Sequence, residues 1–130
     1  MSRRFVVAAV VIRDDSGRIL LVRKKGTSRF MLPGGKIESG ETALQCAVRE
    51  AHEELGAVLD PDAMVELGQW ETAAANEPDH LVHGTIFTHP YVDGIRVSGE
   101  IGELLWLDPR DADARTDLAP LFQHYVLPAL

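Results

Sequence analysis

Three glutamates, Glu50, Glu53 and Glu54, lie close together in one segment of the chain. Apolar residues recur there at three- and four-residue spacing from Glu41 to Leu55, which predicts a helix. On a helix that turns ~100° per residue, the three acids fall within an arc of about 100° beside the apolar face. Like charges at this spacing destabilise a helix slightly. Two interpretations are open at this point: a solvated acidic face, or oxygen ligands for a hard divalent cation such as Mg2+ or Mn2+.

A glycine-rich segment upstream of these acids favours the cation. Pro33, Gly34 and Gly35 predict a tight, irregular turn. Glycine lets the backbone approach a ligand closely, so that a carbonyl could point toward the same cation. Lys36, next in the chain, can offer a hydrogen-bond donor to a phosphate. The combination indicates a site where cations held by carboxylates bind phosphate oxygens.

The spacing of these residues resembles the Nudix box. Gly35 is followed by five residues and Glu41, and then by seven residues and the run Arg-Glu-Ala-His-Glu-Glu-Leu-Gly-Ala over residues 49–57. Every fixed position of the box is filled, although its two aliphatic positions hold only alanine. The resemblance implies an α/β/α sandwich around a mixed, curved β-sheet, in which the box forms a loop–helix–loop. The chain shows no internal repeat, low-complexity tract or linker, which predicts one domain over residues 1–130.

The resemblance suggests a role for each residue of the box. Glu50 and Glu54 would be the main ligands of Mg2+ or Mn2+, and Glu53 would be a ligand or a base that activates water. Gly34 would offer its carbonyl to the cation. Arg49 would pair with Glu41 and orient the glutamates. The residues that would support the box structurally are Glu41, Gly40 and Gly56.

Carboxylates outside the box often supply another ligand or base in this family. Glu100, shortly before an apolar strand, is the first candidate and Glu103 the second. The alternative for both is a solvated loop charge. Asn76 and Glu77 lie in a polar segment that could edge a pocket.

Substrate phosphates are expected to meet positive charge near the end of the second strand. Arg23 and Lys24 stand there, and together with Lys36 and Gly35 they form the predicted substrate-binding set. Because successive side chains of a strand alternate between its faces, only part of this basic cluster can point inward. The alternative is that these charges only face solvent.

The reaction that the resemblance implies is attack of water on a phosphorus of a nucleoside diphosphate linked to another group, assisted by metal ions. Marks of the subgroups that cleave ADP-ribose, dinucleoside polyphosphates, NADH and coenzyme A are missing. The preferred substrate is therefore a nucleoside triphosphate or a modified one, converted to monophosphate and pyrophosphate. The alternatives are nucleotide sugars or dinucleotides such as ADP-ribose, and a non-catalytic nucleotide-binding module. The presence of all three box glutamates favours the enzyme.

Composition limits the partners. The formal net charge of −7 argues against an extended nucleic-acid surface but allows a small nucleotide once cations neutralise the carboxylates. A single cysteine, Cys46, excludes a disulfide within the chain, fits a cytoplasmic location and is expected to be a packing residue. The apolar run 5–12 is interpreted as a buried first strand rather than a signal peptide, and no segment has the length of a membrane span. Monomer and homodimer both stay open.

The other elements are expected to form the sheet that carries the helix. Turn residues 14–17 separate the apolar runs 5–12 and 19–22, which predicts a hairpin. Further strands are predicted over 64–70, 81–88 and 104–107, and a closing helix over 118–127. Four aromatic residues near these strands are expected in the core rather than in a base-stacking role: Trp70, Phe87, Tyr91 and Trp106.

Overall fold

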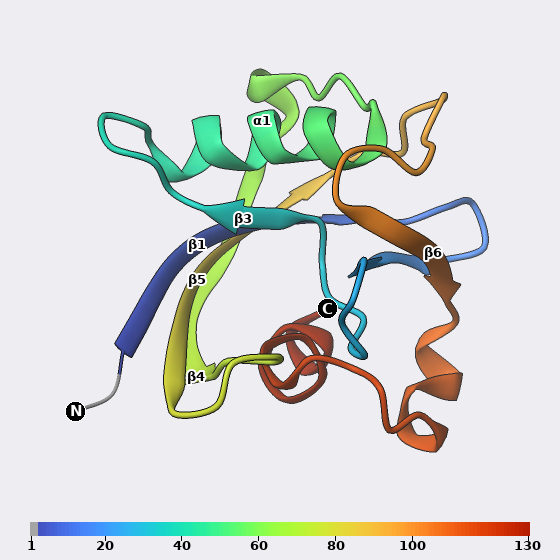
Figure 1. Cartoon of the computed structure of the whole chain (residues 1–130). Coiled ribbons are helices and arrows are strands. Elements are labelled where there is room, and N and C mark those ends of the chain that lie inside the picture. Colours follow the sequence, from blue (N-terminus) through green and yellow to red (C-terminus); the bar gives the residue numbers. More distant parts are fainter. Residues whose placement is uncertain (1–2) are drawn as a thin grey trace.

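The computed structural model describes residues 3–130 and arranges them as two sheets with helices on both sides (Figure 1). The strands are β1 (Arg3–Ile12), β2 (Ile19–Lys24), β3 (Gly34–Lys36), β4 (Val65–Ala73), β5 (His80–His89) and β6 (Ile101–Leu107). The helix α1 spans Ala43–Leu55, and residues 3–130 also contain four short helical turns: η1 (Pro61–Ala63), η2 (Pro109–Ala114), η3 (Phe122–Val126) and η4 (Leu127–Ala129). In this described part of the chain, no helix combines the length and the apolar character that a membrane span requires.

The larger sheet is mixed and has the strand order β3-β1-β5-β4. Its central strands β1 and β5 run parallel along their whole length, whereas β3 and β4 pair antiparallel to their neighbours. The second sheet is the antiparallel pair β2-β6. The strands predicted over 64–70, 81–88 and 104–107 are thus confirmed, with β4 extending three residues further.

The predicted hairpin between the first two strands is wrong beyond its turn. Asp14 and Gly17 close the turn with a backbone hydrogen bond of 3.0 Å, but beyond an isolated bridge from Arg13 to Ile19 the two strands do not pair with each other within residues 3–130. Both edges of β1 are already paired, with β3 on one side and β5 on the other. The second strand therefore finds its partner in β6, far along the chain.

The predicted turn at Pro33-Gly34-Gly35 is also wrong, because Gly34 begins strand β3. Gly34 pairs with Ala9 of β1, and Gly35 pairs with Ala8. A Cβ atom on Gly34 would collide with the carbonyl oxygen of Ala8. The glycine thus serves close packing of two strands rather than a change of chain direction.

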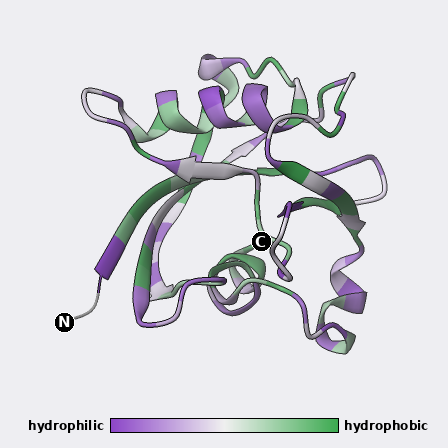
Figure 2. Cartoon of the chain, in the orientation of Figure 1, coloured by the Kyte–Doolittle hydropathy of each residue, from purple (hydrophilic) through white to green (hydrophobic). Residues whose placement is uncertain are grey.

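Alternation along β1 separates two apolar layers. Val10 and Ile12 pack in a cluster with Ala51 and Leu55 of α1, while Val11 packs in a cluster on the other side of the sheet. That second cluster is completed by the buried side chains of the C-terminal segment, Leu118, Phe122 and Val126. Figure 2 shows apolar residues on the strands between α1 and the C-terminal turns. Helical layers on both faces of a mixed sheet confirm the expected sandwich.

The closing helix predicted over residues 118–127 forms only in part. Its first residue is extended, since Leu118 bridges to Phe30 and Ala119 donates a backbone hydrogen bond to the Phe30 carbonyl. Helical structure begins at Pro120 and passes into the wider turn η3 and the tighter turn η4. Competition from the pairing with Phe30 explains the late start.

Of the four aromatic residues expected in the core, three are confirmed and one is not. Phe87 is buried, and Trp70 and Trp106 are partly buried against core clusters. Tyr91 is 48% exposed and contacts Trp106 from the outside, with ring centroids 6.0 Å apart. Tyr91 lies after the end of β5, outside the strands that contribute to the core clusters.

Candidate active site

Helix α1 is held at both ends by local interactions that the sequence specifies. Thr42 caps its start: the threonine hydroxyl accepts from the backbone of Gln45 at 3.1 Å, and the Gln45 side chain accepts from the backbone of Thr42 at 2.9 Å. Gly56 ends the helix with a positive φ of 65° and donates to the His52 carbonyl. The predicted helix and its glycine stop are confirmed, and His52 is exposed as expected.

Small residues let α1 pack closely on the strands. Three of its residues are fully buried on the side that faces the strands: Cys46, Ala47 and Ala51. The thiol of Cys46 donates to the carbonyls of Gly35 and Lys36 at 3.3 and 3.4 Å, and burial raises its pKa to about 11. Cys46 is therefore a packing residue that fastens the helix to β3, as predicted, and it stays protonated at neutral pH.

Glu54 is a buried carboxylate with few partners. Its exposed fraction is 4%, and the one hydrogen bond it accepts within residues 3–130 comes from the backbone N–H of Gly34 at 3.1 Å. Burial raises the pKa of Glu54 to about 8 against the lowering effect of that hydrogen bond, and the nearby Glu50 charge raises it further. The positive charge of Lys24 acts in the opposite direction. An ionised Glu54 would be a buried charge that the protein alone compensates poorly.

Arg49 connects the other acids of the helix. Its guanidinium donates two hydrogen bonds to Glu41, at 2.7 and 2.9 Å, and these hold the pKa of that carboxyl at about 2. A third bond reaches Glu50 at 2.8 Å, and longer ones reach Glu53 at 3.3 Å. The bidentate pair with Glu41 fixes the guanidinium plane, so Arg49 orients Glu50 and Glu53 from a rigid base.

Gly35 makes room for one of these carboxylates. A Cβ atom at Gly35 would lie 2.5 Å from the carboxyl carbon of Glu50. The backbone of β3 therefore meets the acidic face of α1 at two adjacent positions, with Gly34 donating to Glu54 and Gly35 lying against Glu50. A side chain at position 35 would displace Glu50, whereas a side chain at position 34 would collide with Ala8 and Ala9 of β1.

The glutamate side chains of α1, in the arrangement seen here, provide only part of the oxygen ligands that a hard divalent cation prefers. Glu50 and Glu54 offer carboxylate oxygens beside each other, and Glu54 lacks the partners that a buried charge needs. The Glu53 side chain is 54% exposed and turned toward Arg49. Within residues 3–130, no three acidic, histidine or cysteine side chains are already arranged to hold a metal ion. For Glu53 to act as a further ligand, its side chain would have to rotate away from Arg49.

The loop before β6 is fastened to the C-terminal end of α1. Ser98 donates to the carbonyl of Glu54 at 3.0 Å, and Arg96 donates to that of Leu55 at 2.9 Å. Glu100, two residues after Ser98, is exposed at the start of β6, and its carbonyl accepts from the backbone of Lys25. The structure thus places Glu100 in the neighbourhood of the helix end, with a side chain that makes no ion pair within the described residues.

The predicted basic residues separate into two groups. Arg23 forms an ion pair with Glu103 at 3.2 Å and donates to the Thr27 carbonyl at 3.0 Å. Arg23 and Glu103, the second candidate for a carboxylate outside the box, are therefore paired with each other. Lys24 and Lys36 line a cavity beside β3. Alternation along β2 explains the separation, because neighbouring residues of a strand face opposite sides.

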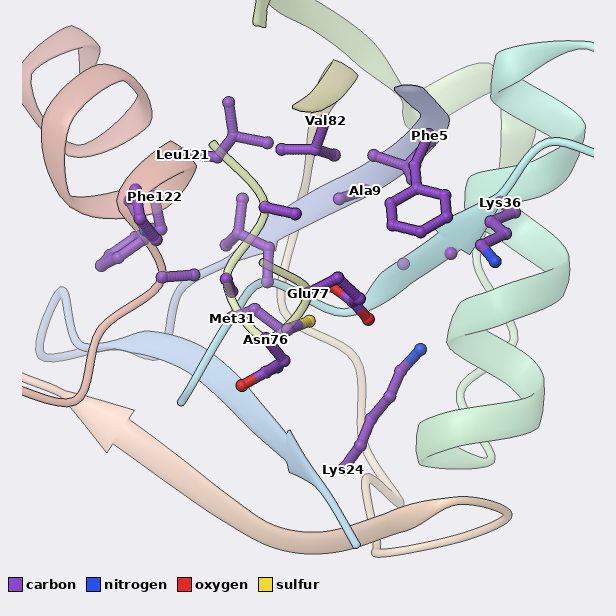
Figure 3. A pocket seen from close by; sticks show the side chains of 18 of the residues that line it. Phe5, Ala9, Lys24, Met31, Lys36, Asn76, Glu77, Val82, Leu121 and Phe122 are labelled. Carbon is purple, nitrogen blue, oxygen red and sulfur yellow. The ribbon is translucent and has the colours of Figure 1, made fainter. Parts of the chain in front are cut away.

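This cavity has a volume of about 160 Å³ and mostly apolar walls (Figure 3). Gly34 and Gly35 form the part of its lining that adjoins the helix carboxylates. Asn76 and Glu77, from the loop between β4 and β5, also line it, as the sequence suggested. The remaining walls could not be recognised from the sequence, because their apolar residues look like ordinary core positions; among them are Phe5, Val82, Leu121 and Phe122.

Comparison with known proteins agrees with this architecture. The family model named NUDIX domain matches residues 3–129. A protein of Bacillus subtilis (strain 168) named putative 8-oxo-dGTP diphosphatase is 32% identical over 103 residues, which cover 78% of this chain and 65%, just under two thirds, of that protein. A MutT-like protein of Streptomyces ambofaciens is 30% identical over 125 residues, covering 95% of this chain and 75% of that protein.

Among solved structures, the crystal structure of a MutT protein from Methanosarcina mazei Go1 has the same fold, with a TM-score of 0.83. The sequence identity is 21%, and the similarity covers 98% of this chain and 94% of that one. The family model, the Streptomyces relative and the fold agree over nearly the whole length of the chain. The chain belongs to the Nudix family.

Proposed function

We propose that this protein is a divalent-cation-dependent hydrolase that converts a nucleoside triphosphate, normal or modified, to its monophosphate and pyrophosphate. The observation that supports it most is the buried Glu54 beside Glu50, placed where β3 separates the helix acids from an apolar cavity. The name of the Bacillus subtilis relative, putative 8-oxo-dGTP diphosphatase, supports the same class of substrate. A substrate from the nucleotide pool would place the activity in the cytoplasm.

Each box residue has a separate task in this proposal. Glu50 and Glu54, with the carbonyl of Gly34, would hold Mg2+ or Mn2+, and the cation would lower the pKa of water and neutralise phosphate charge. Glu53 accepts the proton of the attacking water or serves as a third ligand. The water oxygen forms a bond to phosphorus, the bond from phosphorus to the bridging oxygen breaks, and pyrophosphate leaves. Arg49 keeps the carboxylates in place through its pair with Glu41.

The substrate would lie across β3. Its phosphates would meet Lys24 and Lys36, and its base would enter the apolar cavity, where burial of a flat ring is favourable. Glu100 is our candidate for a further carboxylate from the loop that the helix end anchors. Arg23 is a weaker candidate for substrate binding because Glu103 and Thr27 occupy its donors.

A nucleotide panel tests the proposal directly. The wild-type protein is expected to release pyrophosphate from at least one of the four common deoxynucleoside triphosphates or 8-oxo-dGTP in Mg2+ or Mn2+, and to release none in EDTA. Mass spectrometry of the products would distinguish monophosphate plus pyrophosphate from diphosphate plus phosphate. Equal inactivity on all of these substrates with either metal would contradict the proposed substrate class.

The two glycines of β3 provide a matched pair of variants. Gly34→Ala is expected to lower the melting temperature strongly, because its Cβ would collide with the backbone of Ala8. Gly35→Ala meets only the end of the flexible Glu50 side chain, which can rotate away. It should therefore fold almost normally but bind Mg2+ at least 10-fold more weakly, since Glu50 is displaced. Thermal unfolding and calorimetric Mg2+ titration check both parts; undiminished Mg2+ affinity in Gly35→Ala would count against Glu50 as a ligand.

A further inference from the structure

The loop between β4 and β5 forms a fixed wall of the cavity. Residues 73–77 line it. The loop is closed by a backbone hydrogen bond from Ala74 to the His80 carbonyl at 2.9 Å. The His80 ring donates through Nδ1 to the Pro78 carbonyl at 2.6 Å and stacks on Phe5 with 5.0 Å between ring centroids. These anchors hold the tip of the loop over the cavity before any ligand binds.

Thr27 and Lys36, two of the polar residues that line the cavity, already have a partner within the described residues. The hydroxyl of Thr27 donates to the Lys24 carbonyl at 2.8 Å, and the Lys36 ammonium lies 4.2 Å from the centre of the Phe5 ring. The carboxamide of Asn76, half-buried, makes no hydrogen bond within residues 3–130. Figure 3 shows Asn76 beside Met31 on the cavity wall. Asn76 is thus an uncharged donor and acceptor left free for a ligand.

Apolar walls alone distinguish flat ligands of similar size poorly, because they make the same contacts with each. A carboxamide offers two N–H donors and one carbonyl acceptor, so it pairs best with a ring edge that carries a donor next to an acceptor. Glu77, the neighbouring residue, can only accept when ionised and would repel phosphates. The hydrogen-bonding pattern of Asn76 therefore favours a base at its end of the cavity.

We infer that Asn76 determines base specificity by pairing with the polar edge of the nucleobase while the apolar walls hold its faces. The inference rests on the proposed function and adds the residue that selects among substrates. Nothing in the geometry requires Asn76 for the chemical step, because it lies on the loop between β4 and β5 and not on α1 or β3.

The test compares Asn76→Ala and Asn76→Asp with Gln69→Ala, which removes a carboxamide from the exposed strand β4 outside the cavity. For the best substrate, Asn76→Ala should lower kcat/KM about 10-fold, mainly through KM, as expected for one neutral hydrogen bond. In Asn76→Ala, the ratio of kcat/KM between the best and the worst nucleobase should become smaller. Asn76→Asp should change the order of preference, since it loses its donors, and Gln69→Ala should leave every ratio unchanged.

Two readouts separate failure of this inference from failure of the proposed function. If the wild type is active but both Asn76 variants keep its ratios of kcat/KM within twofold, or lose activity equally on all bases, the inference is wrong and the hydrolase stands. Calorimetric Kd values for the same nucleotides require no turnover. Equal Kd ratios in wild type and variants would overturn the inference even if no hydrolysis were found.

Discussion

Glu54→Gln is expected to lower kcat/KM on the best nucleotide by on the order of 10³-fold without disturbing the fold. Glutamine has the same shape and keeps an oxygen that can accept from the backbone N–H of Gly34. It removes only the charge that a divalent cation requires. Steady-state kinetics in saturating Mg2+, together with circular dichroism of the variant, would measure both parts of the expectation.

Glu66→Gln is the matched control for this change. Glu66 is exposed on β4 and forms no ion pair within the described residues, so the same loss of one charge should leave kcat/KM within twofold of the wild type. If Glu54→Gln kept more than a tenth of the wild-type activity, Glu54 could not be a main ligand. The cation would then have to be held by Glu50 and Glu53 with other groups.

The second large effect concerns stability in the absence of metal. In EDTA, the free energy of unfolding is expected to fall by a few kcal/mol as pH rises from about 4.5 to about 8. The unfolded chain releases the Glu54 proton near the ordinary glutamate pKa of 4.5, whereas the folded chain keeps it until its pKa of about 8. The folded state therefore binds more protons in this window, and deprotonation favours unfolding. Addition of Mg2+ at pH 8 should restore the stability, because the cation neutralises the buried charge.

Urea unfolding of wild type and Glu54→Gln across this pH range isolates the effect. The variant has no group to titrate at this position. The free energy of unfolding of Glu54→Gln should therefore rise relative to that of the wild type as pH rises. Parallel curves of unfolding free energy against pH from pH 5 to pH 8 would contradict the raised pKa of Glu54.

Glu41 has the opposite effect on stability below pH 4.5. Its pKa of about 2 reflects its pair with Arg49, so both proteins should lose stability as pH falls below 4.5 and Glu41 is protonated.

Local features of the site were well predicted from sequence. The helix, its glycine stop at Gly56 and the pair between Arg49 and Glu41 appear in the structure as expected. Each depends on residues within one or two turns of each other or on a box whose spacing is fixed. Such interactions are nearly independent of the rest of the fold, which is why their pattern is visible in the chain itself.

The pairing of strands was not predictable in the same way. The turn at residues 14–17 forms, yet β2 pairs with β6 instead of β1, and the glycines at 34 and 35 extend a sheet instead of turning the chain. An apolar strand buried on both faces has no alternation that would identify its neighbour. The choice depends on which edges are still unpaired once β5 has joined β1, a fact that no local pattern contains.

The sequence by itself determined that three carboxylates would stand on one side of a capped helix, preceded by two glycines. Only the tertiary structure decided that Glu54 is buried against Gly34 while Glu53, one residue earlier, is exposed. It also brought Lys24, Asn76 and Phe122 to one cavity beside them. The physical reason is that helical spacing sets the direction of a side chain, whereas its burial, and with it the pKa, depends on distant segments that fold over it.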